Sequence, residues 1–294
     1  MIGERSRIER IIDQINSRNA KKVALVLVVG FAFYHSLLHI RYGTNSCKWL
    51  LSDGRYKADQ EWQPYGCMLH LYSKIDTRNC LRYIAYYGTE TYFVFIGDTR
   101  IRELYIGFVE HLIQDEEISP KPQSHYTNLS HVDNKLKIKV DFIWAPLISP
   151  LMVESFREWQ HAVDPPSVII VGSALWPIIM SNGSVSMLQE YRKNLTRLVQ
   201  PIDQLREKKT KVLWALQEPV NEDKLKHDYH MVSNELIDMY DKQAIELLSH
   251  SAADLWWSVR LVAQGMMSES PDGLYLAKKG SQTQCSNIAE YVLQ

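Results

Sequence analysis

A change of hydrophobic period between residues 91 and 112 limits the possible folds of this chain more than any other feature. Residues 92–96 form an unbroken apolar run of β-branched and aromatic side chains, typical of a strand buried on both faces of a parallel sheet. Apolar residues then recur at helical spacing, at Ile101, Leu104, Tyr105, Phe108 and Leu112. The segment Gly97-Asp98-Thr99 is therefore predicted to be a tight turn from a strand into a helix.

The predicted turn is also a place where chemistry is expected. Ligands and catalytic groups in open α/β sheets lie just beyond the carboxyl ends of the strands. The Thr99 hydroxyl would stand in the first helical turn, near unpaired backbone N–H groups that can stabilise a developing oxyanion. The alternative is structural, with Thr99 as a helix cap and Asp98 as a turn residue. Both interpretations fit this stretch taken alone.

Four further strands are predicted, at residues 136–142, 167–171, 211–216 and 254–259. Residues 113–135, with Pro120 and Pro122, are predicted to form a long loop, and helical apolar stripes lie between the later strands. Strands that alternate with helices indicate a parallel sheet with right-handed crossovers. The predicted fold class is α/β, a doubly wound parallel sheet of about five strands with helices on both faces.

The N-terminal part of the chain predicts a membrane anchor. Residues 23–40 are an 18-residue run without a formal charge, at the low end of the length that spans a bilayer. Basic residues are concentrated before this run, so the positive-inside rule favours an uncleaved signal anchor at residues 23–41. Residues 1–22 would then be a cytosolic tail and residues 42–294 a lumenal domain. A buried core helix is the alternative.

Sequons and cysteines agree with a lumenal location. Three Asn-x-Ser/Thr triplets predict glycosylation at Asn128, Asn182 and Asn194. Four cysteines are candidates for disulfides in an oxidising lumen, Cys47, Cys67, Cys80 and Cys285. They allow three pairings, and their spacing does not choose among these. No Cys-x-x-Cys or His-x-x-x-Cys cluster occurs, so no metal site is predicted, and the formal net charge of −1 predicts no nucleic-acid partner.

The loops after the first three strands open on one edge of such a sheet, and the late loop 270–275 is expected to reach the same edge. Acyl transfer on this scaffold needs a nucleophilic hydroxyl, a base, an acid that orients the base, and N–H donors for the oxyanion. Thr99 can supply the hydroxyl and Asp272 the orienting carboxylate. The base is expected three residues after that acid, where this chain has Tyr275.

These two segments resemble a known superfamily. The sequence Phe-Ile-Gly-Asp-Thr-Arg-Ile-Arg at residues 95–102 is similar to the first block of the SGNH acyl-esterases, and residues 272–275 resemble their last block, Asp-x-x-His. Further motifs, in matching order and spacing, begin at Asn45, Trp62, Asn79, Val140 and Gln217. They resemble the lumenal domain of the animal sialate O-acetyltransferases, and the chain is identified as a member of that family.

The resemblance implies a Golgi membrane enzyme that transfers an acetyl group from acetyl-CoA to a hydroxyl of sialic acid, with CMP-sialic acid or a sialoglycan as acceptor. The matching positions are Thr99 for the nucleophile, Asp272 for the triad acid and Tyr275 for the triad base. Gly172 matches a family glycine near the oxyanion region, and Asp98 of the first block is a further candidate for the oxyanion or substrate-binding site. A main-chain N–H of Thr99 or Gly172 is the expected oxyanion donor.

Two triad positions depart from the family pattern, which has Ser and His there. Thr in place of Ser keeps the hydroxyl but adds a methyl group that restricts rotation. A phenol with an ordinary pKa of about 10 is protonated at neutral pH and cannot take a proton from Thr99. Losing a triad base costs on the order of 10⁴ to 10⁶ in kcat. The sequence therefore predicts one of two functions. The first is an O-acetyltransferase with impaired chemistry, and the alternative is an inactive, membrane-anchored module that binds sialoglycans or has a regulatory role.

No replacement base is indicated by spacing among the histidines of the lumenal part, which include His111, His125, His131, His227 and His230. The family enzymes continue into a multi-span membrane domain, whereas this sequence has no second apolar run of 18 residues. A fragment or short isoform of such an enzyme and a free-standing paralogue are both compatible with that difference.

Several residues near the predicted site have two interpretations. Arg100 or Arg102 can pair with the sialic acid carboxylate, or with Glu103 or solvent on a helix face. Three tryptophans, Trp176, Trp256 and Trp257, can stack on a sugar or belong to an aromatic core. Two carboxylates, Glu218 and Asp223, can line the cleft or belong to an ordinary loop.

Overall fold

A six-stranded sheet lies at the centre of the computed structural model, which describes residues 17–42, 47, 49–56, 62–66, 73–87, 90–113 and 126–276. The strand order is β4-β5-β3-β6-β7-β8, and all neighbours are parallel except β4 and β5. The strands are β3 (Thr91–Gly97), β4 (Leu129–Asp133), β5 (Ile138–Trp144), β6 (Val168–Gly172), β7 (Lys211–Ala215) and β8 (Ala253–Trp256). In the sheet, β5 and β4 thus lie on one side of β3, and β6, β7 and β8 follow on the other side.

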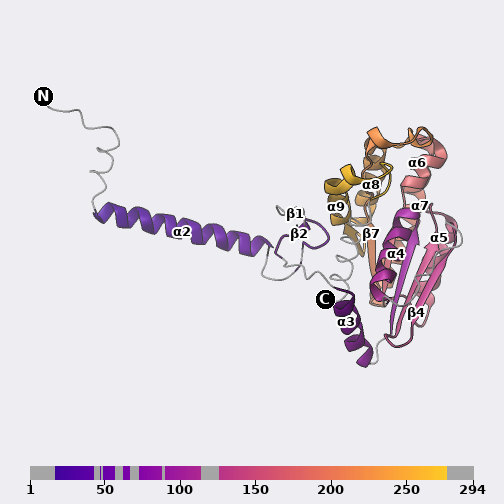
Figure 1. The fold of residues 1–294 in the computed structure, drawn as a ribbon, viewed down its shortest axis with the longest axis horizontal. Coiled ribbons are helices and arrows are strands. Elements are labelled where there is room, and N and C mark those ends of the chain that lie inside the picture. Colours follow the sequence, from indigo (N-terminus) through magenta and orange to yellow (C-terminus); the bar gives the residue numbers. More distant parts are fainter. Residues whose placement is uncertain are drawn as a thin grey trace.

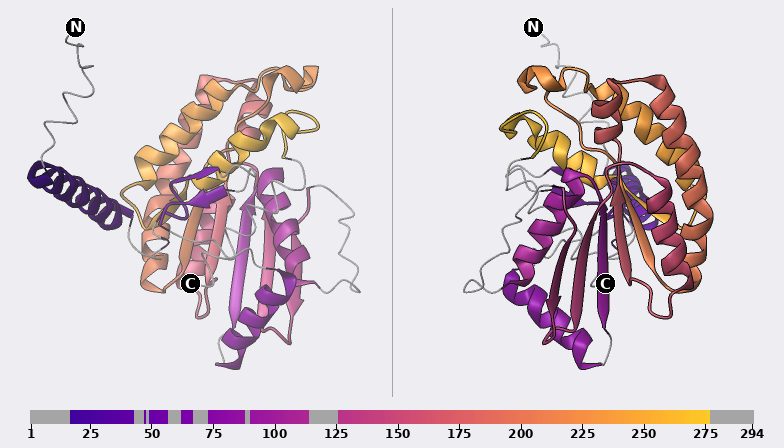
Figure 2. Two further views of the ribbon diagram at one scale, coloured as in Figure 1. Left: turned by 60° about the vertical axis from the view of Figure 1, so that its left-hand side comes forward. Right: turned by 90° about the vertical axis from the view of Figure 1, so that its right-hand side faces the viewer.

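Helices cover both faces of this sheet, as Figure 2 shows. Side chains of β3 alternate between two cores: Phe93 and Phe95 lie in one, Val94 and Ile96 in the other. The first core is covered by α4 (Thr99–Leu112), with α3 (Lys74–Tyr86) and α9 (Ser258–Met266) contributing Leu81 and Val259. The second is covered by α5 (Pro150–His161), α6 (Leu175–Ser181), α7 (Val185–Glu207) and α8 (Asn234–Leu248). The predicted doubly wound α/β class is confirmed.

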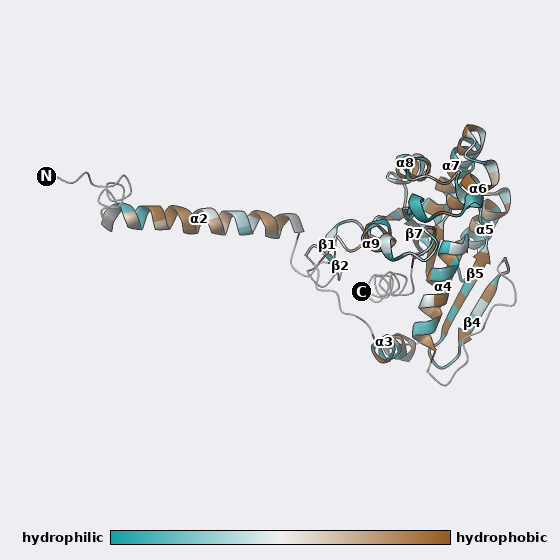
Figure 3. Cartoon of the chain, turned by 45° about the horizontal axis from the view of Figure 1, so that its top comes forward, coloured by the Kyte–Doolittle hydropathy of each residue, from teal (hydrophilic) through white to brown (hydrophobic). Residues whose placement is uncertain are grey.

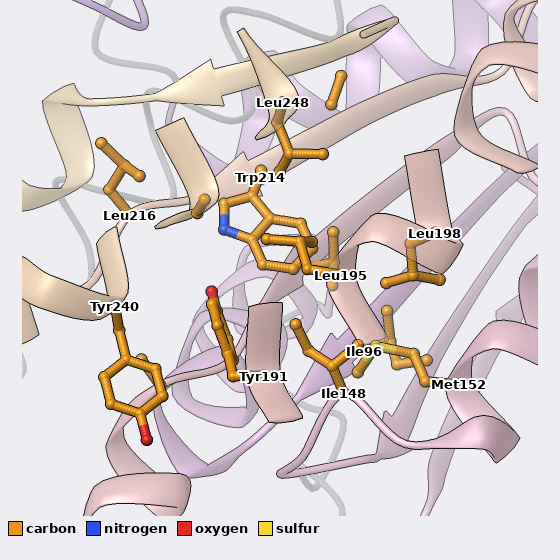
Figure 4. Packing of buried hydrophobic residues seen from close by; sticks show 14 of the residues in the cluster. Ile96, Ile148, Met152, Tyr191, Leu195, Leu198, Trp214, Leu216, Tyr240 and Leu248 are labelled. Atoms are coloured by element: carbon orange, nitrogen blue, oxygen red, sulfur yellow. The ribbon is translucent and has the colours of Figure 1, made fainter. Parts of the chain in front are cut away.

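The second core is the larger one and packs around Trp214 of β7. Figure 4 shows its indole beside Leu195 and Tyr191 of α7, with Leu248 of α8 nearby. Trp214 is only 1% exposed, and burial of such side chains supplies most of the favourable free energy of folding. The core therefore fixes α7 and α8 against the sheet and holds the strand ends in register.

Two boundaries differ from the sequence prediction. The predicted loop 113–135 contains β4, which pairs with β5 as an edge strand in which half-buried and exposed residues alternate. The predicted fifth strand ends at Trp256, because Ser258 begins α9. The tryptophan-rich run 254–259 therefore contains the end of a short strand and the start of a helix. The spacing of its apolar residues alone does not reveal this boundary.

An N-terminal helix, α2 (Ser17–Tyr42), extends away from the sheet domain (Figure 1). Its segment Asn19–Ile40 has a mean hydropathy of 2.0, and none of the most apolar stretch is buried. Figure 3 shows apolar residues along most of this helix. By length and composition it fits a single membrane span, and the alternative of a buried core helix is wrong. A small antiparallel pair, β1 (Gly54–Tyr56) and β2 (Trp62–Pro64), lies between α2 and α3 in the chain.

Some of the predicted modification sites need correction. Asn194 lies within α7, is only 5% exposed, and its amide donates to the Ile148 carbonyl at 2.8 Å. A folded chain cannot carry a glycan there, whereas Asn128 and Asn182 are exposed. Cys47 is in a disulfide and Cys80 is a free thiol on α3, so Cys80 is wrong as a disulfide candidate. Cys67 and Cys285 lie outside the described residues.

Candidate active site

The turn from β3 into α4 places Thr99 at the carboxyl edge of the sheet, as the sequence predicted. Asp98 is the N-cap of α4, and its side chain accepts a hydrogen bond from the Arg100 N–H at 2.9 Å. Gly97 lies opposite Trp144 of β5 on one side and Gly172 of β6 on the other. Thr99 therefore stands over the middle of three strand ends, beside the point where the chain changes winding direction, where ligands bind in such sheets.

Two glycines allow α4 to begin this close to the sheet. A Cβ atom on Gly97 would lie 2.4 Å from the Gly172 carbonyl oxygen and 2.6 Å from Cγ1 of Ile101. A Cβ atom on Gly172 would lie 2.9 Å from Cδ1 of Ile101. The side chain of Ile101 thus occupies the space that these glycines leave. This packing explains why a glycine occupies position 172, without a role in binding the oxyanion.

Asp98 is completely buried, a position that does not favour the predicted contact with substrate. Burial raises the pKa of its carboxyl from 3.8 to about 6, against the opposing effects of the Arg100 guanidinium and backbone N–H groups. The nearby Glu218 carboxylate raises that pKa further. Asp98 therefore caps α4 and belongs to a buried charge cluster with Arg100 and Glu218.

Arg100 fastens the start of α4 to two loops. Its Nη1 donates to the Glu218 carbonyl at 2.7 Å, its Nη2 donates to the Leu274 carbonyl at 3.0 Å, and its Nε lies 3.8 Å from the Glu218 carboxylate. Arg100 is 6% exposed and Arg102 is 2% exposed. Because both side chains are buried, this geometry does not support the prediction that one of them binds the carboxylate of a sugar. Glu218 is buried with Arg100, while Asp223 is exposed in η1 (Glu222–Lys224).

Asp272 organises the last loop of the described chain. Its Oδ1 accepts hydrogen bonds from the Leu274 N–H at 2.9 Å and the Tyr275 N–H at 3.0 Å. Ser270, which is not among the predicted site residues, donates through its hydroxyl to the Tyr275 carbonyl at 2.6 Å. Asp272 thus positions Tyr275 through the backbone and does not contact the phenol. A turn of this kind is a recurrent use of Asp, so the signal was present in the Ser-Pro-Asp-Gly sequence.

The side chains of Thr99 and Tyr275 meet at this edge. The two hydroxyl groups share a hydrogen bond, which acts to lower the pKa of Tyr275. Burial has the opposite and larger effect and raises that pKa to about 12. The structure therefore brings together two of the three predicted triad residues directly and the third through the backbone. The phenol stays protonated at neutral pH and cannot act as a general base.

No histidine among the described residues hydrogen-bonds Thr99 or Tyr275. His111 lies in the last turn of α4, where burial lowers the pKa of its imidazole, and His131 is on β4. His227 and His230 stack on each other, with ring centroids 5.1 Å apart, around η2 (His227–Tyr229). His125 lies outside the described residues. Within the described part, no group of three or more His, Cys, Asp or Glu could hold a metal ion.

Three aromatic rings lie at the strand ends on either side of Thr99. Trp144 ends β5, Trp176 is the second residue of α6, and Tyr126 precedes β4; their ring centroids are 5.0–5.6 Å apart. Trp176 is one of the sugar-binding candidates predicted from the sequence, whereas Trp144 and Tyr126 are not. Trp256, in contrast, is fully buried in the core and its Nε1 donates to the Ser258 hydroxyl at 2.9 Å. Trp257 packs half-buried against the second core.

A large cavity lies away from these residues. It has a volume of about 820 Å³ at the amino ends of the strands, where its lining includes Thr91, Ile138 and Ser167. A smaller cavity of about 90 Å³ is lined by Leu147, Pro177 and Asn194, next to the loop after β5. The position of Thr99 and its partners, rather than cavity size, identifies the candidate active site, because ligands of open α/β sheets bind at the carboxyl edge.

No family model matches the sequence. The chain is 34% identical over 272 residues to the N-acetylneuraminate (7)9-O-acetyltransferase of Danio rerio. The aligned region is 91% of this chain and 33% of that relative, so the chain spans about a third of the relative's length. The match includes nearly all of the sheet domain and supports the family resemblance that the ordered motifs predicted.

The solved structures that resemble this chain do so at low sequence identity and with TM-scores below 0.5. A putative platelet activating factor from Streptococcus pneumonia is 17% identical with a TM-score of 0.48, covering 75% of this chain and 92% of that one. An acetyl xylan esterase is 13% identical with a TM-score of 0.42, covering 68% of this chain and 98% of that one. With TM-scores this low, the solved structures support no further conclusion about this chain. The sequence match is sufficient by itself: the chain belongs to the sialate O-acetyltransferase family.

Proposed function

We propose that this chain is a sialic acid O-acetyltransferase-like domain that forms an acetyl ester on Thr99 and transfers it slowly. The acetyl donor would be acetyl-CoA and the acceptor a hydroxyl of sialic acid, supplied as CMP-sialic acid or on a sialoglycan. The observation that supports this proposal is the contact between Thr99 at the first turn of α4 and Tyr275 from the Asp272 loop.

The proposed reaction has two balanced steps. Thr99 Oγ1 attacks the acetyl carbonyl, the C–S bond breaks, and the Thr99 proton leaves with the thiol of CoA. A sugar hydroxyl then attacks the acetyl-Thr99 ester, the C–O bond to Thr99 breaks, and the proton of the sugar returns to Thr99. Backbone N–H groups at the start of α4 are the expected oxyanion donors in both steps. Arg100 and Arg102 are buried, which does not favour them as ligands of the CoA phosphates.

The slow rate follows from Tyr275. A phenol with a pKa near 12 does not remove the proton of Thr99 at neutral pH, so the attack proceeds without general-base help. Loss of the base in a catalytic triad lowers kcat by about 10⁴ to 10⁶. The methyl group of Thr99 adds a smaller steric cost.

The proposed setting is a Golgi membrane. The apolar helix α2 would be the only span of the described chain, with residues 1–22 in the cytosol and the sheet domain in the lumen. Exposed Asn128 and Asn182 are then glycosylation sites, and Cys47 forms its disulfide in an oxidising compartment.

The experiment is to incubate the full chain in membranes with acetyl-CoA and to measure acetyl on the peptide that contains Thr99 by mass spectrometry. We expect an ester that hydroxylamine removes and that is absent from Thr99→Ala. The double variant Thr99→Ser with Tyr275→His, given CMP-sialic acid as acceptor, is expected to turn over faster than the natural chain. No ester on either chain would contradict the proposal.

A second function, an inactive module that binds sialoglycans, is favoured by the same phenol. A protonated Tyr275 beside Thr99 offers two hydroxyl groups to a ligand without a means of proton removal. This alternative predicts saturable binding of sialic acid by a chain that never forms the Thr99 ester. Measuring binding and ester formation on one preparation separates the two functions.

A further inference from the structure

The three aromatic side chains Tyr126, Trp144 and Trp176, here called the aromatic cluster, lie beside the Thr99 turn. Trp144 is opposite Gly97 in the β3–β5 register, and the next residue, Ala145, donates its N–H to the Gly97 carbonyl at 2.9 Å. Trp176 follows four residues after Gly172, which is opposite Gly97 in the β3–β6 register. Trp144 is thus the last residue of β5 and Trp176 lies in α6, just after β6, so the two indoles come from the segments on either side of the carboxyl end of β3.

The rings of the aromatic cluster form a single packed group. The Trp144 and Trp176 rings are nearly perpendicular, at 89° with centroids 5.5 Å apart, and Tyr126 contacts both, at 5.0 and 5.6 Å. Edge-to-face packing of this kind holds each ring in a fixed orientation. Tyr126 is 58% exposed, while the two indoles are half-buried. The cluster thus presents a rigid aromatic surface at the edge of the sheet where Thr99 lies.

Trp176 also has an unused hydrogen-bond donor. Its indole Nε1 is covered and has no hydrogen-bond partner among the described residues. A covered donor without a partner costs free energy, and a ligand oxygen that enters beside the indole recovers it. The nearby cations do not compete for such a ligand, because Arg100 and Arg102 are buried.

We propose that the aromatic cluster is the subsite for the sugar ring of the acetyl acceptor, a sialic acid. The C–H face of the pyranose ring would stack on Tyr126, and the Trp176 Nε1–H would donate to an oxygen substituent of the same ring. This arrangement holds an acceptor hydroxyl near Thr99 without using a cation. The inference rests on the proposed function for the identity of the sugar, but its test does not require catalysis.

The test is a binding measurement on the full chain in detergent, with the methyl α-glycoside of N-acetylneuraminic acid as the probe. Saturation-transfer NMR reports which protons of the sugar contact the protein, and tryptophan fluorescence gives the Kd. The free monosaccharide N-acetylglucosamine is the comparison sugar. We expect saturable binding of the sialoside and strong transfer to its ring protons.

Three variants assign the binding to the cluster. Tyr126→Ala removes the exposed ring and is expected to weaken binding about tenfold. Trp176→Phe keeps a ring but removes the N–H and is expected to weaken it about fivefold. The control is Trp159→Phe, since Trp159 is a half-buried tryptophan on α5 that packs on Phe156 with ring centroids 5.3 Å apart, and it is expected to change the Kd less than twofold.

The outcomes separate this inference from the proposed function. Sialoside binding that is equally tight in Tyr126→Ala, Trp176→Phe and Trp159→Phe overturns the subsite, even if Thr99 is acetylated. Binding that depends on Tyr126 and Trp176, in a chain that never forms the Thr99 ester, supports the subsite and removes the enzymatic function. Absence of any saturable sialoside binding overturns the subsite. Ester formation from acetyl-CoA without sugar is measured independently of all three.

Discussion

The charged groups that position the candidate active site suit acyl transfer, whereas the two hydroxyl groups that the site presents lack a base. Arg100 and Asp272 bind backbone groups of the surrounding loops at 2.7–3.0 Å, and they fix the start of α4 and the last loop. The pair Thr99 and Tyr275 is in contact, but its phenol has a pKa of about 12. Positioning and proton transfer are therefore separate properties of this edge. A chain can retain the first without the second.

The largest expected effect comes from restoring a base. In Tyr275→His, the imidazole has an ordinary pKa of about 6.5 and can take the Thr99 proton. Asp272 Oδ1 is used by backbone N–H groups, while its Oδ2 has no hydrogen-bond partner among the described residues and can orient the imidazole. We expect acetyl transfer to rise by about 10³ to 10⁴, measured as acetylated CMP-sialic acid.

The control for this gain is Tyr275→Phe, which also removes the phenol but supplies no base. It should leave the rate near that of the natural chain. Equal gains in the His and Phe variants would mean that the phenol obstructs the site rather than failing as a base. If neither variant gains activity, acetyl transfer lacks a group that lies elsewhere than at this edge of the sheet.

Removing a group that positions the site should lower the stability of the fold. Arg100→Met removes the donors to the Glu218 and Leu274 carbonyls and leaves the buried Glu218 carboxylate without its cation. We expect the free energy of unfolding to fall by about 3 to 5 kcal/mol, measured by urea denaturation. Arg157→Met is the matched control, because Arg157 pairs with Glu154 on the exposed face of α5 and should change stability by less than about 0.5 kcal/mol.

The buried Asp98 should make stability depend on pH. Its pKa rises from 3.8 in the ordinary state to about 6 in the fold, so between these values the folded protein binds more protons than the unfolded chain. Stability therefore falls as pH rises from about 4 to about 6, by roughly 2 to 3 kcal/mol for this group. Asp98→Asn keeps a cap at α4 and should remove that part of the slope. Asp241, with a pKa also near 6, remains as an internal reference. An unchanged slope would mean that Asp98 is not the group that titrates.

The sequence predicted the backbone of this site better than its side-chain environment. The run into Gly97-Asp98-Thr99 and the helical stripe after it carry the periods of a strand and a helix, and both elements are found there. Burial of Arg100 was not predictable, because it depends on loops more than one hundred residues away that cover the start of α4. Asn194 shows the same limit: its triplet reads as a sequon, and only the packing of α7 on the loop after β5 makes it inaccessible.

The smallest expected effect tests the packing that brings Thr99 to the sheet edge. In Gly172→Ala the new Cβ would lie 2.9 Å from Cδ1 of Ile101, the end of a flexible side chain, so we expect a loss of about 1 kcal/mol. Ile101→Val removes that Cδ1 and by itself should cost about 1 kcal/mol. Because the two changes relieve each other, the double variant should be more stable than the sum of the single effects predicts, by urea denaturation. Additive effects would show that Ile101 does not occupy the space left by Gly172, and that α4 is held at the edge by Arg100 and the Asp98 cap instead.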